Sequence, residues 1–348
     1  MKTLLFSLCC SMLVIASSVK AQTESQAAAQ FLLIEPGARA AGLGEAYVAL
    51  AEDATASYFN PAALAGQSVK SLTFTHTKWL PALANDLFYE FIGYALPVEG
   101  WGNFGVNVAF LSLGKQIRTD ERGNILGEFS SYDFAIDFSY GAYLSRKSAA
   151  GIGMKIIRSN LANVGAGIEK GKGVGTTFAI DIGYLYRSPS GLRFGAALRN
   201  LGPKITYIDA AQADMLPQHL VFGAAYRVLD TQYNKFLLTA DLYKPLVVSR
   251  ENSFLTAPVK AWSDQAFKDE VKDMDIHVGG EYQYSLTPDG TSFVALRAGY
   301  SADRDGDLKF ATYGFGLRYS WIQFDVAYLP AQETPLQDNT RFSVNLNF

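Results

Sequence analysis

The side chains best suited to chemistry are few and far apart in this sequence. Three histidines, His76, His219 and His277, could ligate a metal or move protons near neutral pH, but they lie on separate strand-like segments without metal-ligand spacing. The only cysteines, Cys9 and Cys10, fall in an N-terminal apolar stretch. No serine stands in a G-x-S-x-G motif. The sequence therefore predicts no enzymatic activity, no metal and no cofactor.

Two loop-like motifs approximate binding loops without matching them. The glycine-rich run from Gly165 to Gly173 has the wrong spacer for a phosphate loop and places Gly173 where Ser or Thr belongs. The run Asp303–Asp307 has calcium-like spacing but lacks the required glycine and closing glutamate. We expect the first to be an outer loop and the second an acidic hairpin tip.

The composition indicates what kind of scaffold carries these residues. Of 348 residues, 13% are aromatic and only 18% are charged, and the mean hydropathy is +0.06. The body of the chain nevertheless has no run typical of a transmembrane helix. A β-barrel fits both observations, because its strands expose only every second residue to lipid. The net charge of −3 and the lack of a basic cluster interleaved with aromatics predict no nucleic-acid partner.

The first 21 residues are predicted to be a secretory signal peptide. Lys2 supplies the positive start, Leu4–Ile15 the apolar core, and Val19–Ala21 a cleavage site of small residues. Both cysteines lie inside this segment, so the exported chain is expected to have no disulfide framework.

The last nine residues, Thr340–Phe348, alternate strictly between apolar and polar side chains. Phe342, Val344, Leu346 and Phe348 form one face, so this segment is predicted to be a strand with one side in lipid. We predict that these four residues close a barrel by pairing with its first strand. The alternative at this point is an edge strand of a soluble sandwich.

Fourteen alternating segments follow one another from Val69 to the end of the chain, an even number as single-chain bacterial barrels require. They are Val69–Lys78, Asp86–Leu96, Gly102–Leu113, Glu128–Leu144, Ala149–Ser159, Gly173–Arg187, Gly191–Asn200, Pro217–Val228, Lys235–Lys244, Met274–Leu286, Ser292–Ser301, Leu308–Tyr319, Trp321–Tyr328 and Thr340–Phe348. Their connections alternate long and short, which places every long one at the same end. This pattern is typical of outer-membrane barrels, whose short turns are periplasmic.

The polar faces of these segments carry acids that are tolerable only in a wet or paired interior. We predict that six acids point into the lumen: Asp133, Asp137, Asp181, Asp241, Glu281 and Asp325. Aromatic residues near segment ends suit interfacial girdles: Trp79, Trp101, Tyr143, Tyr186, Tyr284, Trp321 and Tyr328. The long connection Ser249–Asp273 is expected to hold a short amphipathic helix that places Val259, Trp262, Phe267 and Val271 near one side.

The stretch Gln22–Ser68 shows neither strand alternation nor a long helical stripe. It is rich in Ala and Gly, yet Phe31–Ile34 and Tyr58–Phe59 are too apolar to remain solvated. A barrel much wider than eight strands has a lumen that its own side chains cannot fill. The sequence therefore predicts an N-terminal plug, or hatch, inside the barrel.

The motif F-L-x-I-x-x-G-A-R-A-x-G-L-G-E-A-Y-V-A-x-A-x-D-A-x-A-x-Y-x-N-P-A-x-L-A, carried by Phe31–Ala65, resembles the N-terminal signature of the PorV/PorQ family. FadL-type fatty-acid transporters resemble it more loosely, at Gly42–Tyr47, Asp53–Ala54 and Asn60–Ala62. The resemblance implies that the segment folds into the barrel as a hatch. Its structural or gating residues would be Gly37, Arg39, Gly42, Gly44, Asp53, Asn60 and Pro61.

The sequence thus divides into a signal peptide (1–21), a hatch (22–68) and an outer-membrane β-barrel (69–348) in contact with membrane lipid. The resemblance implies a part in the type IX secretion pathway of the Bacteroidota, through binding of the C-terminal signal domains of exported cargo, the translocon or the attachment machinery. An alternative is a FadL-like transporter of small hydrophobic compounds, with the ligand held beneath Leu201–Leu216 and Pro245–Asp273. A soluble secreted β-protein is a third interpretation.

Overall fold

The computed structural model describes residues 27–163, 172–209, 213–246, 253–263, 270, 274–303, 308–330 and 339–348. The predicted signal peptide and residues 164–171 and 304–307 of the two loop motifs lie outside this part of the chain. No helix in the described residues is long and apolar enough to cross a membrane.

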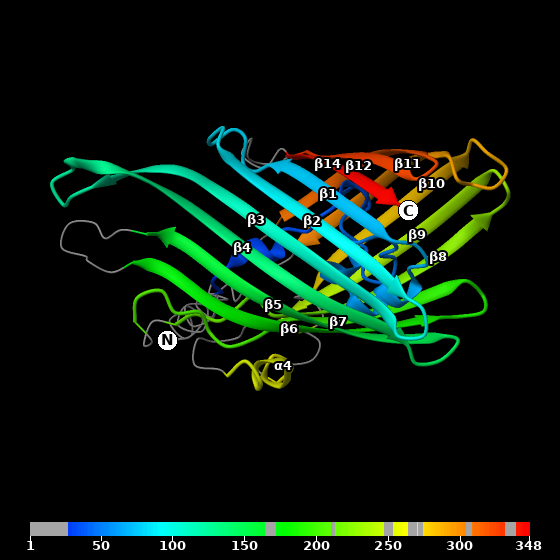
Figure 1. The fold of residues 1–348 in the computed structure, drawn as a ribbon, viewed down its shortest axis with the longest axis horizontal. Coiled ribbons are helices and arrows are strands. Elements are labelled where there is room, and N and C mark those ends of the chain that lie inside the picture. The colour runs from blue at the N-terminus through cyan, green and yellow to red at the C-terminus, as the bar shows by residue number, and fades with distance from the viewer. Residues whose placement is uncertain are drawn as a thin grey trace, which may run out of the picture.

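Fourteen antiparallel strands form one closed barrel in which each strand pairs with its neighbours in sequence and β1 pairs with β14 (Figure 1). The strands are β1 (Ser71–Lys78), β2 (Leu87–Val98), β3 (Gly102–Thr119), β4 (Ile125–Tyr143), β5 (Ser148–Ala162), β6 (Gly173–Arg187), β7 (Leu192–Leu201), β8 (His219–Asp230), β9 (Asn234–Pro245), β10 (Asp275–Ser285), β11 (Phe293–Asp303), β12 (Leu308–Tyr319), β13 (Ile322–Leu329) and β14 (Asn339–Asn347). The predicted fold class, a barrel of 14 strands, is confirmed.

The seam of the barrel lies between its first and last strands. The pairing runs from Ser71 opposite Asn347 to Thr77 opposite Arg341, and Lys70 and Phe348 exchange two backbone hydrogen bonds of 3.0 and 2.9 Å. Phe342 and Phe348 are exposed on the outer face, while Arg341, Ser343 and Asn345 on the other face are buried. Alternation along β14 therefore separates a lipid-facing side from a lumen-facing side.

The same alternation places all six predicted acids on the buried, lumen-facing side of their strands. On β4, for example, Phe138 is half exposed on the outside while its neighbour Asp137 is fully buried. Among the aromatic residues expected near the interfaces, Trp101 and Trp321 are exposed at strand ends, whereas Trp79 packs against the buried apolar cluster.

The two ends of the barrel differ. Connections of seven residues or fewer join β2 to β3, β4 to β5, β6 to β7, β8 to β9, β10 to β11 and β12 to β13 at one end, and every longer connection lies at the other. We call these the short-turn end and the long-loop end. The β3–β4 and β11–β12 connections, also at the long-loop end, have only five and four residues, so the predicted strict alternation of long and short is not kept. At the long-loop end β3 and β4, with 18 and 19 residues, extend beyond the rest of the wall as a hairpin (Figure 1).

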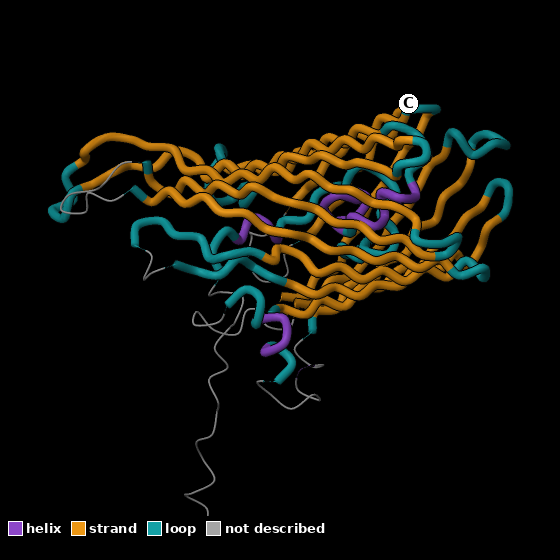
Figure 2. The backbone as a smooth tube through the Cα atoms, turned by 60° about the horizontal axis from the view of Figure 1, so that its bottom comes forward, coloured by secondary structure: helices purple, strands orange, loops and turns teal. Residues whose placement is uncertain are grey.

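Five short helical turns complete the described structure. Four precede β1, namely η2 (Gln30–Leu33), α2 (Ala38–Gly42), α3 (Ala56–Phe59) and η3 (Pro61–Gly66), and α4 (Ala257–Lys260) lies in the connection after β9. Figure 2 shows helical turns enclosed by the strands of the barrel. The predicted inward position of Val259 in α4 is wrong, because Ala257 and Ala261 are buried there while Val259 is exposed. Small alanines allow that side to lie close to Met215 and Phe254. Phe267 and Val271 of the predicted face lie outside the described residues.

Candidate functional site: the N-terminal segment and the barrel wall

Residues Ala27–Lys70, here called the N-terminal segment, lie within the barrel between its walls (Figure 1). The segment is buried almost throughout, with Ala38, Leu43 and Leu64 fully inaccessible. One apolar cluster joins it to inward-facing side chains of the wall, including Phe91 and Ile157. The segment is therefore packed as a core and not as a solvated tail.

Glycines on both sides allow the backbone of the segment to touch the backbone of the wall. Gly44 has a φ of +65°, and a Cβ added there would lie 2.6 Å from the Tyr300 nitrogen. A Cβ at Gly299 of β11 would overlap the backbone of Gly44 itself. Two residues earlier, a Cβ at Gly42 would meet the Gly314 Cα at 3.0 Å. No larger residue fits these positions without moving one backbone away from the other.

The second contact region lies around Asn60 and Pro61, where η3 begins. The Asn60 amide donates to the carbonyls of Val48 (3.0 Å) and Tyr184 (3.1 Å), and its oxygen accepts from the Ala62 nitrogen at 3.1 Å. One side chain thus caps η3, joins it to the rest of the segment and binds it to β6. Pro61 opens η3, where a missing N–H costs nothing. Its backbone packs against wall glycines at Gly141 and Gly151.

Arg39 of α2 makes a bidentate ion pair between the segment and the wall. Its guanidinium donates to both carboxylate oxygens of Glu281 on β10, with Nε at 2.9 Å and Nη2 at 2.8 Å. The two residues are 242 positions apart in sequence. Burial by itself lowers the pKa of Arg39, but the Glu281 carboxylate raises it well above its ordinary value. A bidentate, desolvated pair of this kind is strong and directional.

The Arg39–Glu281 pair continues into a buried network on the wall. Arg297 of β11 donates to Glu281 at 2.5 Å and to Asp325 of β13 at 2.7 Å. Asp325 also accepts from Gln323 at 2.8 Å. Two arginines and two carboxylates therefore balance in charge, which is what makes ions tolerable at this depth. We call Arg39, Glu281, Arg297 and Asp325 the ion cluster.

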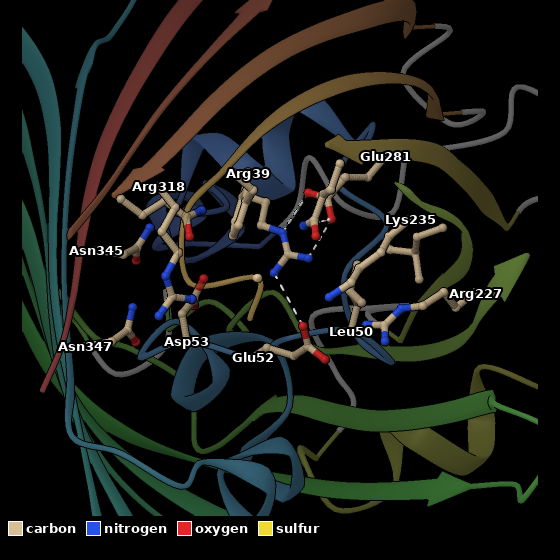
Figure 3. Close-up of a pocket in the computed structure, with 15 residues that line it drawn as sticks. Arg39, Leu50, Glu52, Asp53, Arg227, Lys235, Glu281, Arg318, Asn345 and Asn347 are labelled. Carbon is tan, nitrogen blue, oxygen red and sulfur yellow. Dashed lines mark hydrogen bonds and ion pairs between the residues drawn. The ribbon is translucent and has the colours of Figure 1, made fainter. Parts of the chain in front are cut away.

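Glu52 and Asp53 of the segment lie next to this cluster, toward the short-turn end (Figure 3). Glu52 contacts Arg193 at 2.5 Å and Arg39 at 3.7 Å. Burial raises the pKa of Glu52, but the two arginines outweigh it and hold the pKa below its ordinary value. Asp53 accepts from the Thr55 nitrogen at 2.9 Å and from the Tyr47 hydroxyl at 3.1 Å. It stabilises the turn that leads into α3.

Other inward-facing polar side chains satisfy the backbone of the segment. Asp241 of β9 accepts from the nitrogens of Tyr47 (2.7 Å) and Val48 (2.8 Å), and Thr312 of β12 accepts from Gly44 at 3.0 Å. The Nδ1 of His277 lies 2.8 Å from the Gly44 carbonyl and donates to it. Irregular backbone within a membrane barrel needs partners of this kind, because water is excluded.

Another set of polar contacts between the segment and the wall surrounds Glu35, near the start of the segment. Burial raises the pKa of Glu35 well above its ordinary value, and the nearby Glu45 adds to this effect. The Tyr243 hydroxyl donates to Glu35 at 2.5 Å, and Arg341 of β14 donates to its carbonyl at 2.7 Å. Arg341 also pairs with Glu45 at 2.8 Å. The last strand of the barrel thus holds the segment as well as closing the wall.

A cavity of about 220 Å³ opens between the N-terminal segment and β8–β14 at the short-turn end. Its lining is largely polar and includes Arg39, Glu52 and Glu281 (Figure 3). Within the described residues, no group of three or more His, Cys, Asp and Glu side chains is arranged to hold a metal ion.

Of the seven residues that sequence resemblance assigned to the hatch, five contact the barrel wall: Arg39, Gly42, Gly44, Asn60 and Pro61. The other two act within the segment, where Gly37 has a φ of +91° at the start of α2 and Asp53 accepts from Thr55 and Tyr47. Sequence reasoning missed several wall residues that contact the segment, namely Arg297, Thr312, the wall glycines and Asn103 of β3, which donates to the carbonyls of Leu64 (2.5 Å) and Gln67 (2.7 Å). A signal for the glycines existed, because Gly141, Gly183 and Gly299 occupy inward positions in alternating strands.

The closed 14-strand wall, with apolar residues outward and a polar, occupied interior, defines an integral β-barrel protein of the outer membrane. Within that class the chain belongs to the PorV family: the family model, described as type IX secretion system protein PorV, matches residues 17–252. No curated protein matches the sequence.

Solved structures with the same fold include transporters of aromatic hydrocarbons. They are the toluene transporter TodX of Pseudomonas putida (TM-score 0.55), the toluene transporter TbuX of Ralstonia pickettii (0.55) and a FadL homologue of Pseudomonas aeruginosa (0.54). Each is 12% identical to this chain, and each alignment covers 90% of this chain and 98% of the other. At this identity the likeness establishes the fold alone.

Proposed function

We propose that this protein is a type IX secretion component that binds exported cargo or the translocon at the cell surface, with the N-terminal segment acting as a hatch that seals the lumen. The observation that carries the proposal is a lumen occupied by a tightly bound segment in a PorV-family barrel. A barrel whose interior is filled acts through its rim and loops, not through a pore.

The charge and packing of the segment support the hatch. A segment held by the ion cluster, by Asn60 and by glycine contacts on opposite walls cannot leave without exposing buried ions and backbone. Each such loss costs free energy in a membrane interior. The resting protein is therefore closed under this proposal.

The β3–β4 hairpin supplies a surface for a protein partner. A tilted transmembrane strand needs about 9 to 11 residues, so strands of 18 and 19 residues reach well past the bilayer. The register shifts between Ser112 and Lys115, where polar side chains replace the apolar outer face. Beyond this point Ile117 and Ile125 are 63% and 72% exposed, next to Leu126. Exposed apolar side chains at a projecting tip suit a protein contact.

The transporter alternative shares the fold but needs a passage past the segment. At the levels of Gly44 and Pro61 the segment touches the wall backbone to backbone. A path there requires displacement of the segment and rupture of the ion cluster. We therefore prefer the secretion role.

The experiment measures binding of a purified C-terminal signal domain from an exported protein to the barrel in detergent. Wild type should bind, and Ile117→Ser with Ile125→Ser should weaken binding by about tenfold or more, because interface apolar anchors carry most of the affinity. The matched control is Leu144→Ser, equally exposed but at the short-turn end. A lipid-like ligand retained in native mass spectra, without signal-domain binding, would favour the transporter instead.

A further inference from the structure

The cavity at the short-turn end is more than a gap left by the segment. Its floor is buried and includes Glu281, Asn345 and Leu50. Its rim carries Lys235, Arg227 and Arg318, the ends of strands that meet at the short turns. Figure 3 shows Lys235 and Arg227 approaching from one side and Arg318 from the other, with Arg39 between them.

The carboxylates that line this cavity already have ion-pair or hydrogen-bond partners. Glu281 is held by Arg39 and Arg297, and Glu52 by Arg193. Asp53 accepts hydrogen bonds from within its own turn. The ion-pair and hydrogen-bond partners of these carboxylates are therefore residues other than Lys235 and Arg318.

The cationic side chains at the rim of the cavity have fewer ion-pair and hydrogen-bond partners than these carboxylates. Arg318 donates its Nε to the Ser320 carbonyl at 3.1 Å, and among the described residues its two terminal nitrogens have no acceptor. Lys235 has neither an ion pair nor a hydrogen bond within the same part of the chain. Arg227 pairs with Asp230 through one nitrogen at 3.1 Å. The rim thus presents several unused N–H donors and excess positive charge to one enclosed space.

We propose that this cavity binds a carboxylate- or phosphate-bearing ligand that enters from the short-turn, periplasmic end. Arg318 offers a planar fork that matches such groups, and Lys235 adds a second charge from the opposite rim. A volume of 220 Å³ is about that of seven waters at roughly 30 Å³ each, enough for a small organic anion or an acidic chain end. The site lies at the opposite end from the proposed signal-domain surface and does not depend on it.

The same anionic chemistry has two possible sources, a dissolved solute or the carboxyl terminus of a peptide. Calorimetric titration of the full-length protein in detergent at low salt distinguishes them with three probes. These are inorganic pyrophosphate, the peptide acetyl-Gly-Gly-Glu with a free terminus, and the same peptide as its terminal amide.

We expect the wild type to bind pyrophosphate or the free-acid peptide, and binding to weaken as salt screens the rim. Binding of pyrophosphate alone assigns a solute site, and preference for the free acid over the amide assigns a chain-end site. Lys235→Gln with Arg318→Gln should weaken binding by about tenfold to a hundredfold, as the loss of charge-assisted hydrogen bonds implies. The control Lys309→Gln removes an exposed charge at the opposite end of β12 and should change nothing.

Heat-modifiable mobility of the double variant confirms that its barrel is folded, so that lost binding reports on the site. The proposal is overturned if no probe binds wild type at millimolar concentration. It is equally overturned if the double variant binds as well as the Lys309→Gln control.

Discussion

Substitution of Glu281 by Gln removes the one carboxylate shared by Arg39 and Arg297. The ion cluster then changes from balanced to one uncompensated positive charge, because only Asp325 remains against two arginines. Removing one partner of a buried pair costs about 3 to 5 kcal/mol. Since Arg39 lies on the N-terminal segment, that cost weakens its attachment to the wall.

A cysteine at Ala41 reports the attachment directly, since this position is fully buried in α2 and the only native cysteines are Cys9 and Cys10. In the protein with Ala41→Cys, maleimide labelling proceeds only when the segment leaves the wall. If docking loses 3 to 5 kcal/mol, the undocked fraction increases by a factor of between about one hundred and a few thousand. The labelling rate of Glu281→Gln should rise by that factor.

Two controls separate this effect from general destabilisation. Glu90→Gln breaks a pair with His76 in which both side chains are 40% exposed, and it should change the rate by less than about fivefold. Adding Arg39→Gln to Glu281→Gln removes the excess charge and should restore part of the protection. If Glu281→Gln alone labels within twofold of its parent, the ion cluster does not hold the segment.

Three further predictions concern the fit of the segment, its charge and the seam. Gly299→Val should abolish protection of the segment because its Cβ overlaps the backbone of Gly44, whereas Gly280→Val, whose Cβ has no neighbour closer than 3.6 Å, should retain it in the same labelling assay. Because the pKa of Glu52 is held below its ordinary value, its contribution to docking is complete above the unfolded pKa of about 4.5 and is lost as pH falls through the lower folded value. Maleimide reacts with the thiolate, so each labelling rate is divided by the rate of free cysteine at the same pH. This ratio should be constant near neutrality and increase on acidification, and a ratio that falls instead would contradict the charge assignment. Deletion of Phe348 removes two backbone hydrogen bonds to Lys70 and should reduce the heat-modifiable fraction on gels, and an unchanged fraction would show that the seam does not need this residue.

Strand alternation in the sequence was enough to predict the wall of the barrel. Phe138 and Asp137 fall on opposite faces because successive side chains of a strand point in opposite directions, a rule that needs no tertiary information. The inward position of Glu281 and Asp325 followed from the same rule. Boundaries were less accurate at β3 and β4, which continue beyond the membrane, where hydrophobic alternation fades.

The partners of the inward residues were not predictable from alternation. Arg39 and Glu281 meet across 242 residues, a pairing decided by how the segment lies in the lumen and not by any local pattern. The sequence prediction considered only acidic residues in the lumen and therefore missed Arg297. Its inward position on β11 follows the same period of two. Helical periodicity failed for α4, since Val259 marked an apolar face that the small residues Ala257 and Ala261 occupy instead.

Hydrogen exchange measured by mass spectrometry on the mature protein in detergent tests the central claim, that the N-terminal segment is a docked hatch. The nitrogens of Ala41, Leu43 and Gly44 are all hydrogen-bonded and buried, so peptides covering Ala38–Leu50 should exchange as slowly as peptides from β10–β12. Exchange of Ala38–Leu50 at the rate of an unstructured chain, while the strands remain protected, would contradict the account.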